Sequence, residues 1–190
     1  MTGFEEDIKL SLETLRKGGV ILYPTDTVWG LGCDPTNPSA VNKLLEIKPR
    51  GENKSLIVLV NGLTMLERYV KDIPGTAYEL IEVSDSPLTI IYPAGRNFAP
   101  GVCAEDSSVG IRICYEEFCS ELISRFRKPI VSTSANISGK PSPANFGEID
   151  PDLIKKADYA VRYRRDDKRK FHPSSVIRVE SNGVVKIIRQ

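Results

Sequence analysis

The sequence contains very little histidine and no closely spaced cysteines. His172 is the single histidine among 190 residues, and the four cysteines, at positions 33, 103, 114 and 119, form no Cys-X-X-Cys pair. A zinc site built from cysteine and histidine needs such spacing, so we assign no metal-ligating residues. General-base catalysis by histidine would depend on His172 alone. We therefore expect chemistry that relies on positioning and charge.

The sequence also lacks a long apolar run and an excess of charge of one sign. It has no uninterrupted apolar stretch of about 18 residues and no basic-then-apolar leader, so membrane insertion and secretion are not supported. The 26 Lys+Arg and 25 Asp+Glu residues give a net charge of +1. This balance argues against a surface coated with basic residues for non-specific nucleic-acid binding. Unpaired cysteines fit a reducing compartment, and we expect a cytoplasmic protein.

The length is that of one compact domain. A chain of 190 residues, 41% of them hydrophobic, buries roughly 70% of its unfolded surface on folding, so it requires neither disulfides nor a structural metal. We expect a single domain over residues 1–190.

Hydrophobic patterning predicts interleaved helices and strands. Helices are predicted at 9–15, 38–48, 62–70, 75–83 and 118–126, and Asn37-Pro38 supplies an N-cap and a first-turn proline for the second of them. Strands are predicted at 20–23, 56–60, 88–92, 109–114 and 129–131, and residues 24–33 suit a strand-to-helix loop. Two further Val/Ile-rich runs flank Ser181-Asn182-Gly183, a hairpin signal, so the last two strands should be antiparallel. The order indicates an α/β or α+β fold with a mixed sheet.

A basic turn follows the helix that ends before Pro49. Lys48, Pro49 and Arg50 place a lysine and an arginine two positions apart in a proline-restricted turn. Cations near the C-terminus of a helix commonly stabilise the helix dipole, and this structural role is about as well supported as a functional one. The functional alternative is a polyanion site, in which lysine supplies a point charge and arginine a bidentate fork.

Hydroxyl and amide side chains are concentrated after the strand at 129–131. The stretch 132–138 holds three serines, a threonine and an asparagine, which indicates either a turn with a helix cap or a pocket that orients a polar ligand. Thr25, Asp26 and Thr27 follow an earlier strand and could face the same crevice. No P-loop is present, and Gly30-Leu31-Gly32 lacks the third glycine of a dinucleotide fingerprint. Side chains would have to hold any nucleotide.

Two other charged features are open to more than one interpretation. In the strand at 109–114, Arg112 alternates with Val109, Ile111 and Ile113 and should face away from the apolar side. Residues 162–170 include six basic residues and are best interpreted as a solvated surface loop. An electrostatic contact with RNA or a substrate phosphate is the alternative.

Several motifs occur in order along most of the chain. They are Tyr23-Pro-Thr-Asp-Thr-Val-Trp-Gly-Leu-Gly32, Lys48-Pro-Arg50, Ser55-Leu-Ile-Val58, Ser108-Val-Gly-Ile-Arg112, Ser132-Thr-Ser-Ala-Asn-Ile-Ser-Gly139 and Pro141-Ser-Pro143. Together they resemble the YrdC/Sua5 family from about residue 8 to the C-terminus. The resemblance implies an α/β fold, a single-domain twisted mixed sheet flanked by helices with a concave basic cavity.

The resemblance also implies an activity. Family members of this kind are threonylcarbamoyl-AMP synthases, nucleotidyltransferases that convert L-threonine, bicarbonate and ATP into threonylcarbamoyl-adenylate and pyrophosphate. A separate transferase system would use the product to make N6-threonylcarbamoyladenosine in tRNA. Mg²⁺ is expected with ATP, and direct contact with tRNA or double-stranded RNA is left open.

Site residues follow from the same resemblance. Lys48 and Arg50 would be the catalytic residues and would grip the ATP phosphates. The other nucleotide contacts implied are Ser108, Ser132, Ser134, Asn136, Ser142 and Arg189. Thr25, Arg112 and Ser174 would lie on the threonine side, where the fork of Arg112 suits a carboxylate.

The sequence departs from the family pattern at two places. Charged residues 164–170 and then His172-Pro173-Ser174-Ser175 stand where the family usually has a glycine-rich stretch followed by Glu-Ser-Thr or Pro-Ser-Thr. Leu59 stands where longer members can have a histidine near threonine. Two alternatives therefore remain: a YciO-like paralogue with weak or different activity, and a non-catalytic RNA-binding module.

Overall fold

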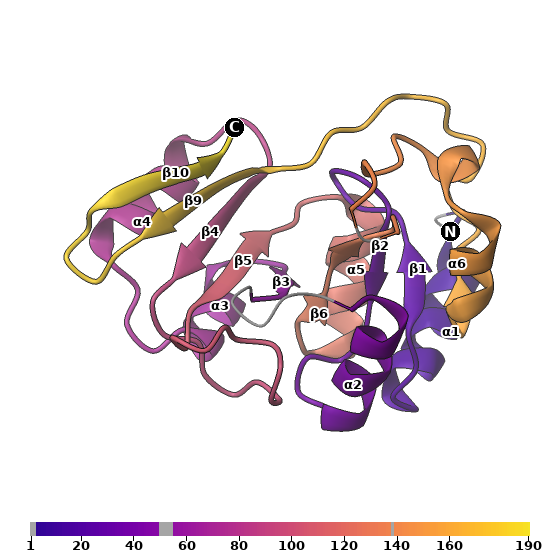
Figure 1. Cartoon of the computed structure of the whole chain (residues 1–190), viewed down its shortest axis with the longest axis horizontal. Coiled ribbons are helices and arrows are strands. Elements are labelled where there is room, and N and C mark those ends of the chain that lie inside the picture. Colours follow the sequence, from indigo (N-terminus) through magenta and orange to yellow (C-terminus); the bar gives the residue numbers. More distant parts are fainter. Residues whose placement is uncertain (1–2, 50–54, 138) are drawn as a thin grey trace.

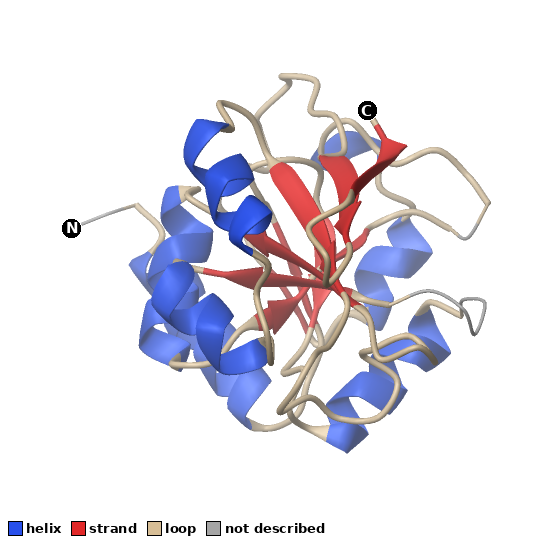
Figure 2. Ribbon diagram, turned by 90° about the vertical axis from the view of Figure 1, so that its left-hand side faces the viewer, coloured by secondary structure: helices blue, strands red, loops and turns tan. Residues whose placement is uncertain are grey.

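The structure is a computed structural model that describes residues 3–49, 55–137 and 139–190. Ten short strands form two hydrogen-bonded sheets, and the helices lie outside the strands (Figures 1 and 2). The mixed α/β fold flanked by helices confirms the expectation from the sequence, with the strands divided over two mixed sheets.

The smaller sheet has four strands in the order β7-β2-β1-β8. These are β7 (Thr133–Ser134), β2 (Gly30–Gly32), β1 (Ile21–Tyr23) and β8 (Tyr159–Ala160). β1 is antiparallel to β2 and parallel to β8, and β2 is antiparallel to β7. The sheet is therefore mixed.

The larger sheet has six strands in the order β10-β9-β4-β5-β3-β6. These are β10 (Val185–Arg189), β9 (Ser175–Val179), β4 (Leu88–Tyr92), β5 (Val109–Ile113), β3 (Ile57–Val60) and β6 (Ile130–Val131). β9 and β10 form the antiparallel hairpin predicted around Asn182-Gly183, whereas β4 with β9 and β3 with β5 are parallel pairs. The mixed character predicted from the hairpin is confirmed.

The helices cover these strands. They are α1 (Glu5–Arg16), α2 (Pro38–Ile47), α3 (Leu63–Tyr69), α4 (Gly75–Val83), α5 (Glu117–Phe126) and α6 (Pro151–Lys156), with a short 3-10 turn at Phe146–Glu148. α1 packs against α5, and both turn fully buried apolar side chains inward. No described helix is long and apolar enough to span a membrane.

Local sequence explains where α2 begins. The side chain of Asn37 accepts hydrogen bonds from the backbone N–H groups of Ser39 (3.0 Å) and Ala40 (3.4 Å), and Pro38 occupies the first turn. This is the cap predicted from the sequence. The buried face of Ala40, Val41 and Leu44 then holds the helix against the core.

Strand β2 lies where the sequence predicted only a loop, and its two glycines explain why it forms. A Cβ on Gly32 would lie 2.5 Å from the Val131 carbonyl oxygen and 2.6 Å from Cε1 of Tyr23. A Cβ on Gly30 would lie 2.8 Å from Oγ of Ser132. Only glycine permits this close approach of β2 to the chain around residues 131–134. The glycines serve close packing of strands.

The chain passes from one sheet to the other at Ser132. Val131 is the last residue of β6 in the larger sheet, and Thr133 is the first residue of β7 in the smaller one. The Ser132 backbone N–H donates to the Ile57 carbonyl at 2.8 Å, so its place beside β3 is fixed. The hydroxyl-rich stretch therefore lies at the junction of the two sheets.

Candidate active site

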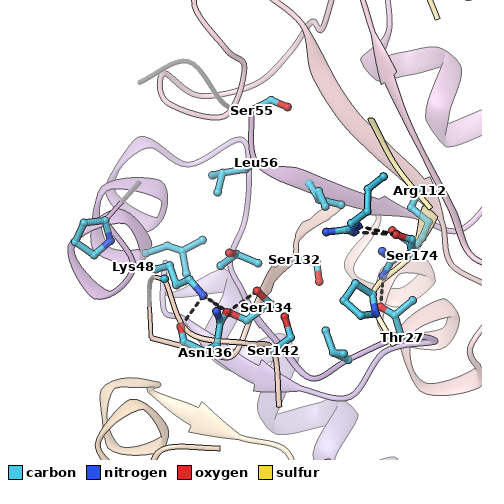
Figure 3. Close-up of a pocket in the computed structure, with 18 residues that line it drawn as sticks. Thr27, Lys48, Ser55, Leu56, Arg112, Ser132, Ser134, Asn136, Ser142 and Ser174 are labelled. Atoms are coloured by element: carbon cyan, nitrogen blue, oxygen red, sulfur yellow. Dashed lines mark hydrogen bonds between the residues drawn. The ribbon is translucent and has the colours of Figure 1, made fainter. Parts of the chain in front are cut away.

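A cavity of about 640 Å³ opens at this junction. Its walls come from segments far apart in the sequence, and Figure 3 shows two groups of polar side chains at its ends. Lys48, Ser134, Asn136 and Ser142 lie at one end, Arg112, Ser174 and Thr27 at the other, and Ser132 between them. The cavity is thus long enough to present two chemically different ends to one ligand.

Lys48 is anchored at the first end by the strand-to-loop backbone. Its Nζ donates to the carbonyl oxygens of Ser134 (2.5 Å) and Asn136 (2.6 Å) and to Oδ1 of Asn136 (2.5 Å). Burial lowers the pKa of Lys48 from 10.5 to about 8. No carboxylate pairs with this ammonium group among the described residues, so it is a cation held by neutral oxygens and favours an anionic ligand.

Asn136 organises the same end. Its Oδ1 also accepts from the hydroxyl of Ser134 at 2.6 Å, and its Nδ2 donates to the carbonyl oxygens of Ile137 (3.1 Å) and Lys140 (2.5 Å). The asparagine thereby links the loop after β7 to Lys48. The hydroxyl-rich stretch is both a hydrogen-bonded turn and part of a cavity wall, but among the described residues no helix begins there, so the predicted helix cap is wrong.

Arg112 dominates the second end. It is 4% exposed, and its Nη2 donates to Oδ1 of Asp26 at 2.9 Å and to the hydroxyl of Thr27 at 3.1 Å. Its Nε is buried with no hydrogen-bond partner in the described chain. A buried guanidinium N–H without a partner is costly, so the ion pair with Asp26 and the bond to Thr27 are what hold this side chain in place.

A second arginine lies beside it. Arg189 donates from Nε (3.1 Å) and Nη2 (2.8 Å) to the carbonyl oxygen of Ser174, whose hydroxyl in turn pairs with that of Thr89 at 2.8 Å. Burial, together with the positive charge of Arg112, lowers the pKa of Arg189. Two neighbouring arginines make this end attractive to a carboxylate or phosphate.

The charged side chains among the described lining residues are all basic: Lys48, Arg112 and Arg189. No aspartate or glutamate belongs to that described lining. The donor set fits an anionic ligand, whereas a divalent cation would need oxygens that the ligand itself supplies.

Comparison with known proteins agrees with this arrangement. Residues 13–190 match the sequence profile of the Sua5/YciO/YrdC family, whose description reads "Telomere recombination". The chain belongs to the Sua5/YciO/YrdC family.

Relatives in this family include a threonylcarbamoyl-AMP synthase from Stenotrophomonas maltophilia, which is 38% identical over 151 residues, 78% of this chain and 81% of the relative. The crystal structure of P. abyssi Sua5 complexed with L-threonine superposes with a TM-score of 0.78 at 29% identity. It covers 92% of this chain and 51% of the Sua5 chain, so the present chain spans about half of that protein. E. coli YciO shares the fold, with a TM-score of 0.84 at 23% identity over 97% of this chain and 89% of YciO.

The fold brings most of the residues predicted for a Sua5/YciO/YrdC site to one cavity. Its lining includes Lys48, Arg112, Ser132, Ser134, Asn136, Ser142, Ser174 and Arg189. Arg50 lies outside the described residues. Thr25 and Ser108 are buried but do not belong to the lining, and the hydroxyl of Thr25 bonds to the Val28 carbonyl at 2.8 Å.

Three lining residues with hydroxyl groups and one carboxylate partner were not selected from the sequence as site residues. Thr27 and Thr133 line the cavity, Ser55 lines it while its hydroxyl accepts from the Gly110 N–H at 3.0 Å, and Asp26 pairs with Arg112. The run Thr25-Asp26-Thr27 was a signal for the crevice, but the residue type alone does not show which hydroxyl turns inward.

The interpretation of residues 162–170 as a solvated loop is wrong for its middle part. Arg164 has a side chain only 12% exposed and donates to the Thr25 carbonyl at 3.0 Å. Arg165 donates to the carbonyls of Val161 and Ala160 and lies over the ring of Phe146 at 4.8 Å. These two arginines fasten the segment to the protein, whereas Lys168 and Lys170 remain exposed.

Proposed function

We propose that the chain is a threonylcarbamoyl-AMP synthase that forms threonylcarbamoyl-adenylate and pyrophosphate from L-threonine, bicarbonate and ATP. The observation that carries the proposal is that Lys48 and Arg112 lie at opposite ends of one cavity with hydroxyl groups between them. The names of the relatives and the threonine complex of P. abyssi Sua5 support it.

Threonine binds at the Arg112 end in this proposal. Its carboxylate binds the guanidinium of Arg112, which Asp26 and Thr27 hold in place through Nη2. Arg189 adds a second positive charge beside it. A carboxylate held by two arginines orients the amino group toward the middle of the cavity.

The ATP phosphates bind at the Lys48 end. An incoming phosphate oxygen replaces one of the three protein oxygens that Lys48 now contacts. Arg50, two residues on, stays a predicted second cation. Mg²⁺ enters as the MgATP substrate, since no carboxylate lines the described part of the cavity.

The protein promotes the reaction by positioning the substrates. The threonine nitrogen attacks the carbon of bicarbonate, water leaves, and a carbamate forms. A carbamate oxygen next attacks the α-phosphorus as the bond to the β-phosphate oxygen breaks and pyrophosphate departs. Lys48 stabilises the charge that develops on the phosphates, and the chain supplies orientation and cations without a side-chain nucleophile. A separate transferase would carry the product to tRNA.

The test is an assay of the purified chain with ATP, Mg²⁺, bicarbonate and labelled L-threonine. Threonine-dependent pyrophosphate and labelled threonylcarbamoyl-adenylate are expected. ATP turnover that is independent of threonine, or no turnover, contradicts the proposal and favours a YciO-like paralogue. RNA binding without turnover that survives Arg50→Ala favours an RNA-binding module.

Variants at the cationic end sharpen the assay. Lys48→Ala and Arg50→Ala should each abolish product formation while the unfolding transition is retained. Lys43→Ala is the matched control, because Lys43 lies in α2, which ends directly before Lys48, but pairs with Asp158, and both side chains of that pair are partly exposed. Wild-type rates in Lys48→Ala would contradict the role given to that ammonium group.

A further inference from the structure

The larger sheet carries a second cavity on the face opposite Arg112. On β5, Arg112 points to the first cavity, whereas Ile111 and Ile113 line the second, as the alternation of strand side chains requires. The second cavity has a volume of about 240 Å³. Its walls come from α3, α4, β4 and β5 and include Leu66, Ile81, Leu88, Ile90 and Tyr92.

One carboxylate stands between the two cavities. Asp26 lines the second cavity, and its Oδ1 accepts from Arg112, which lines the first, at 2.9 Å. Within the described chain, Oδ2 of Asp26 has no recorded hydrogen-bond partner. The side chain is only 15% exposed and belongs to the lining of the second cavity.

The charge of the second cavity has one sign. The charged side chains of its described lining are Asp26 and Asp85, and no lysine or arginine accompanies them. Asp85 lies in a turn that is fixed by the hydroxyl of Ser84, which donates to the Ser86 carbonyl at 2.9 Å. Apolar walls beneath two carboxylates match a molecule with an apolar body and a positive charge.

We propose that this cavity binds a small molecule in which an alkyl or aryl group carries a protonated amine, and that the amine shares Asp26 with Arg112. The volume corresponds to roughly eight water molecules at about 30 Å³ each, which suits a compact amine. Because the amine would bind Oδ2 of the carboxylate whose Oδ1 holds Arg112, it draws the carboxylate away from that pair, and occupancy of this cavity alters the orientation of Arg112 in the first. The proposal does not depend on the reaction proposed above.

Binding is tested with 3-phenylpropylamine, using 3-phenyl-1-propanol as the neutral analogue and 3-phenylpropionate as the anionic one. In NMR titrations of the full chain, the amine should shift the methyl signals of Ile81 and Ile113 and bind about tenfold more tightly than the alcohol, with the acid weaker still. No shift at these methyls, or equal affinity for amine and alcohol, overturns the proposal.

Two variants test the charge and the location. Asp85→Asn should weaken amine binding severalfold and leave alcohol binding unchanged, whereas Glu82→Gln, at an exposed acid outside the lining, should change neither. Ile113→Phe should fill the cavity and remove both. If Ile113→Phe does not fold, Asp85→Asn decides, since that side chain is exposed. Unchanged amine binding in Asp85→Asn counts against the site.

A separate NMR measurement tests whether Asp26 links the two cavities. The Nε–H signal of Arg112 should move when the amine saturates the second cavity and stay in place with the alcohol. This signal reports the arginine directly and requires no turnover. If the amine binds but the Arg112 signal does not move, the link through Asp26 is wrong.

Discussion

Nη2 of Arg112 lies 2.9 Å from Oδ1 of Asp26, a residue 86 positions earlier in the chain. The pair joins β5 of the larger sheet to the loop that follows β1 of the smaller one. Arg112 is thereby fixed in the lining of the cavity, and its Nε is buried without a partner among the described residues. Substitutions at Asp26, Lys48, Gly32 and Arg164 test what each of these residues contributes.

Asp26→Asn removes the charge that compensates Arg112. Because Arg112 is 4% exposed, we expect the free energy of unfolding to fall by about 1.5–3 kcal/mol. The KM for threonine should rise as the guanidinium loses its fixed orientation. Urea unfolding and steady-state kinetics measure both effects. Asp72→Asn, at an exposed position, is the control, and a wild-type KM in Asp26→Asn would show that the pair does not position Arg112.

The low pKa of Lys48 should appear in the pH dependence of ATP use. Burial lowers this pKa to about 8, so the charged form is lost as the pH rises through 8. We expect kcat/KM for ATP to decline above about pH 8. Lys48→Arg keeps its charge and should shift the decline to higher pH, and an identical profile in both proteins would exclude Lys48 as its origin.

The lowered pKa of Lys48 also makes the free energy of unfolding depend on pH. The unfolded lysine keeps its proton up to about pH 10.4, while the folded one releases it near pH 8, so the unfolded chain binds more protons between these values. The contribution of Lys48 therefore makes the free energy of unfolding increase with pH in this window. Denaturant titrations between pH 7.5 and about pH 10 give the free energy of unfolding of wild type and of Lys48→Met. The difference between the two proteins is the contribution of Lys48, and it should increase with pH.

Gly32→Ala should destabilise the smaller sheet. The added methyl would meet the Val131 carbonyl oxygen at 2.5 Å, and backbone cannot move aside cheaply. We expect a loss of about 1–3 kcal/mol in urea unfolding. Gly75→Ala is the control because nothing lies within 4 Å of its Cβ. Equal stability of the two variants would mean that β2 can shift away from β6.

Arg164→Ala should loosen the loop that carries Thr25 and Asp26. The guanidinium of Arg164 donates to the Thr25 carbonyl at 3.0 Å and to Oε1 of Glu116 at 3.4 Å. Burial already raises the pKa of Glu116. The variant also removes the cation that pairs with this carboxylate. We expect the KM for threonine to rise with a smaller change in kcat, because Arg164 positions the loop without lining the cavity.

Arg169→Ala is the matched control for Arg164. It removes an arginine from the same segment whose side chain is 75% exposed and pairs with Asp167, which is 14% exposed. Because this pair does not hold Thr25 or Glu116, the kinetics with threonine should stay close to wild type. If both variants behaved alike, the net charge of the segment, and not the buried contact of Arg164, would control threonine binding.

Features that depend on neighbouring residues were predictable. The Asn37 cap, the apolar strand at 57–60 and the hairpin at Asn182-Gly183 appear where the sequence placed them. The alternation in β5 also indicated correctly that Arg112 leaves the apolar side. Caps, turns and alternation arise from contacts within a few residues, so a local pattern contains the information.

Strand β2 and the inward turn of Arg164 were not predictable in this way. Gly30 and Gly32 have low intrinsic preference for strands, and they form one because β1 and β7 approach too closely for any side chain. Arg164 belongs to a run whose composition is that of a surface loop. Its burial follows from acceptors at Thr25 and Glu116, which are distant in the sequence.

By itself, the sequence determined the class of fold, most helices and strands, and the motifs that mark the Sua5/YciO/YrdC family. The tertiary structure decided which of those residues share a cavity, that Thr27 and not Thr25 lines it, and that Asp26 lies between two cavities. The physical reason is that residue types and their order set local propensity and charge. The direction and partner of a buried polar side chain depend on acceptors that folding brings from elsewhere in the chain.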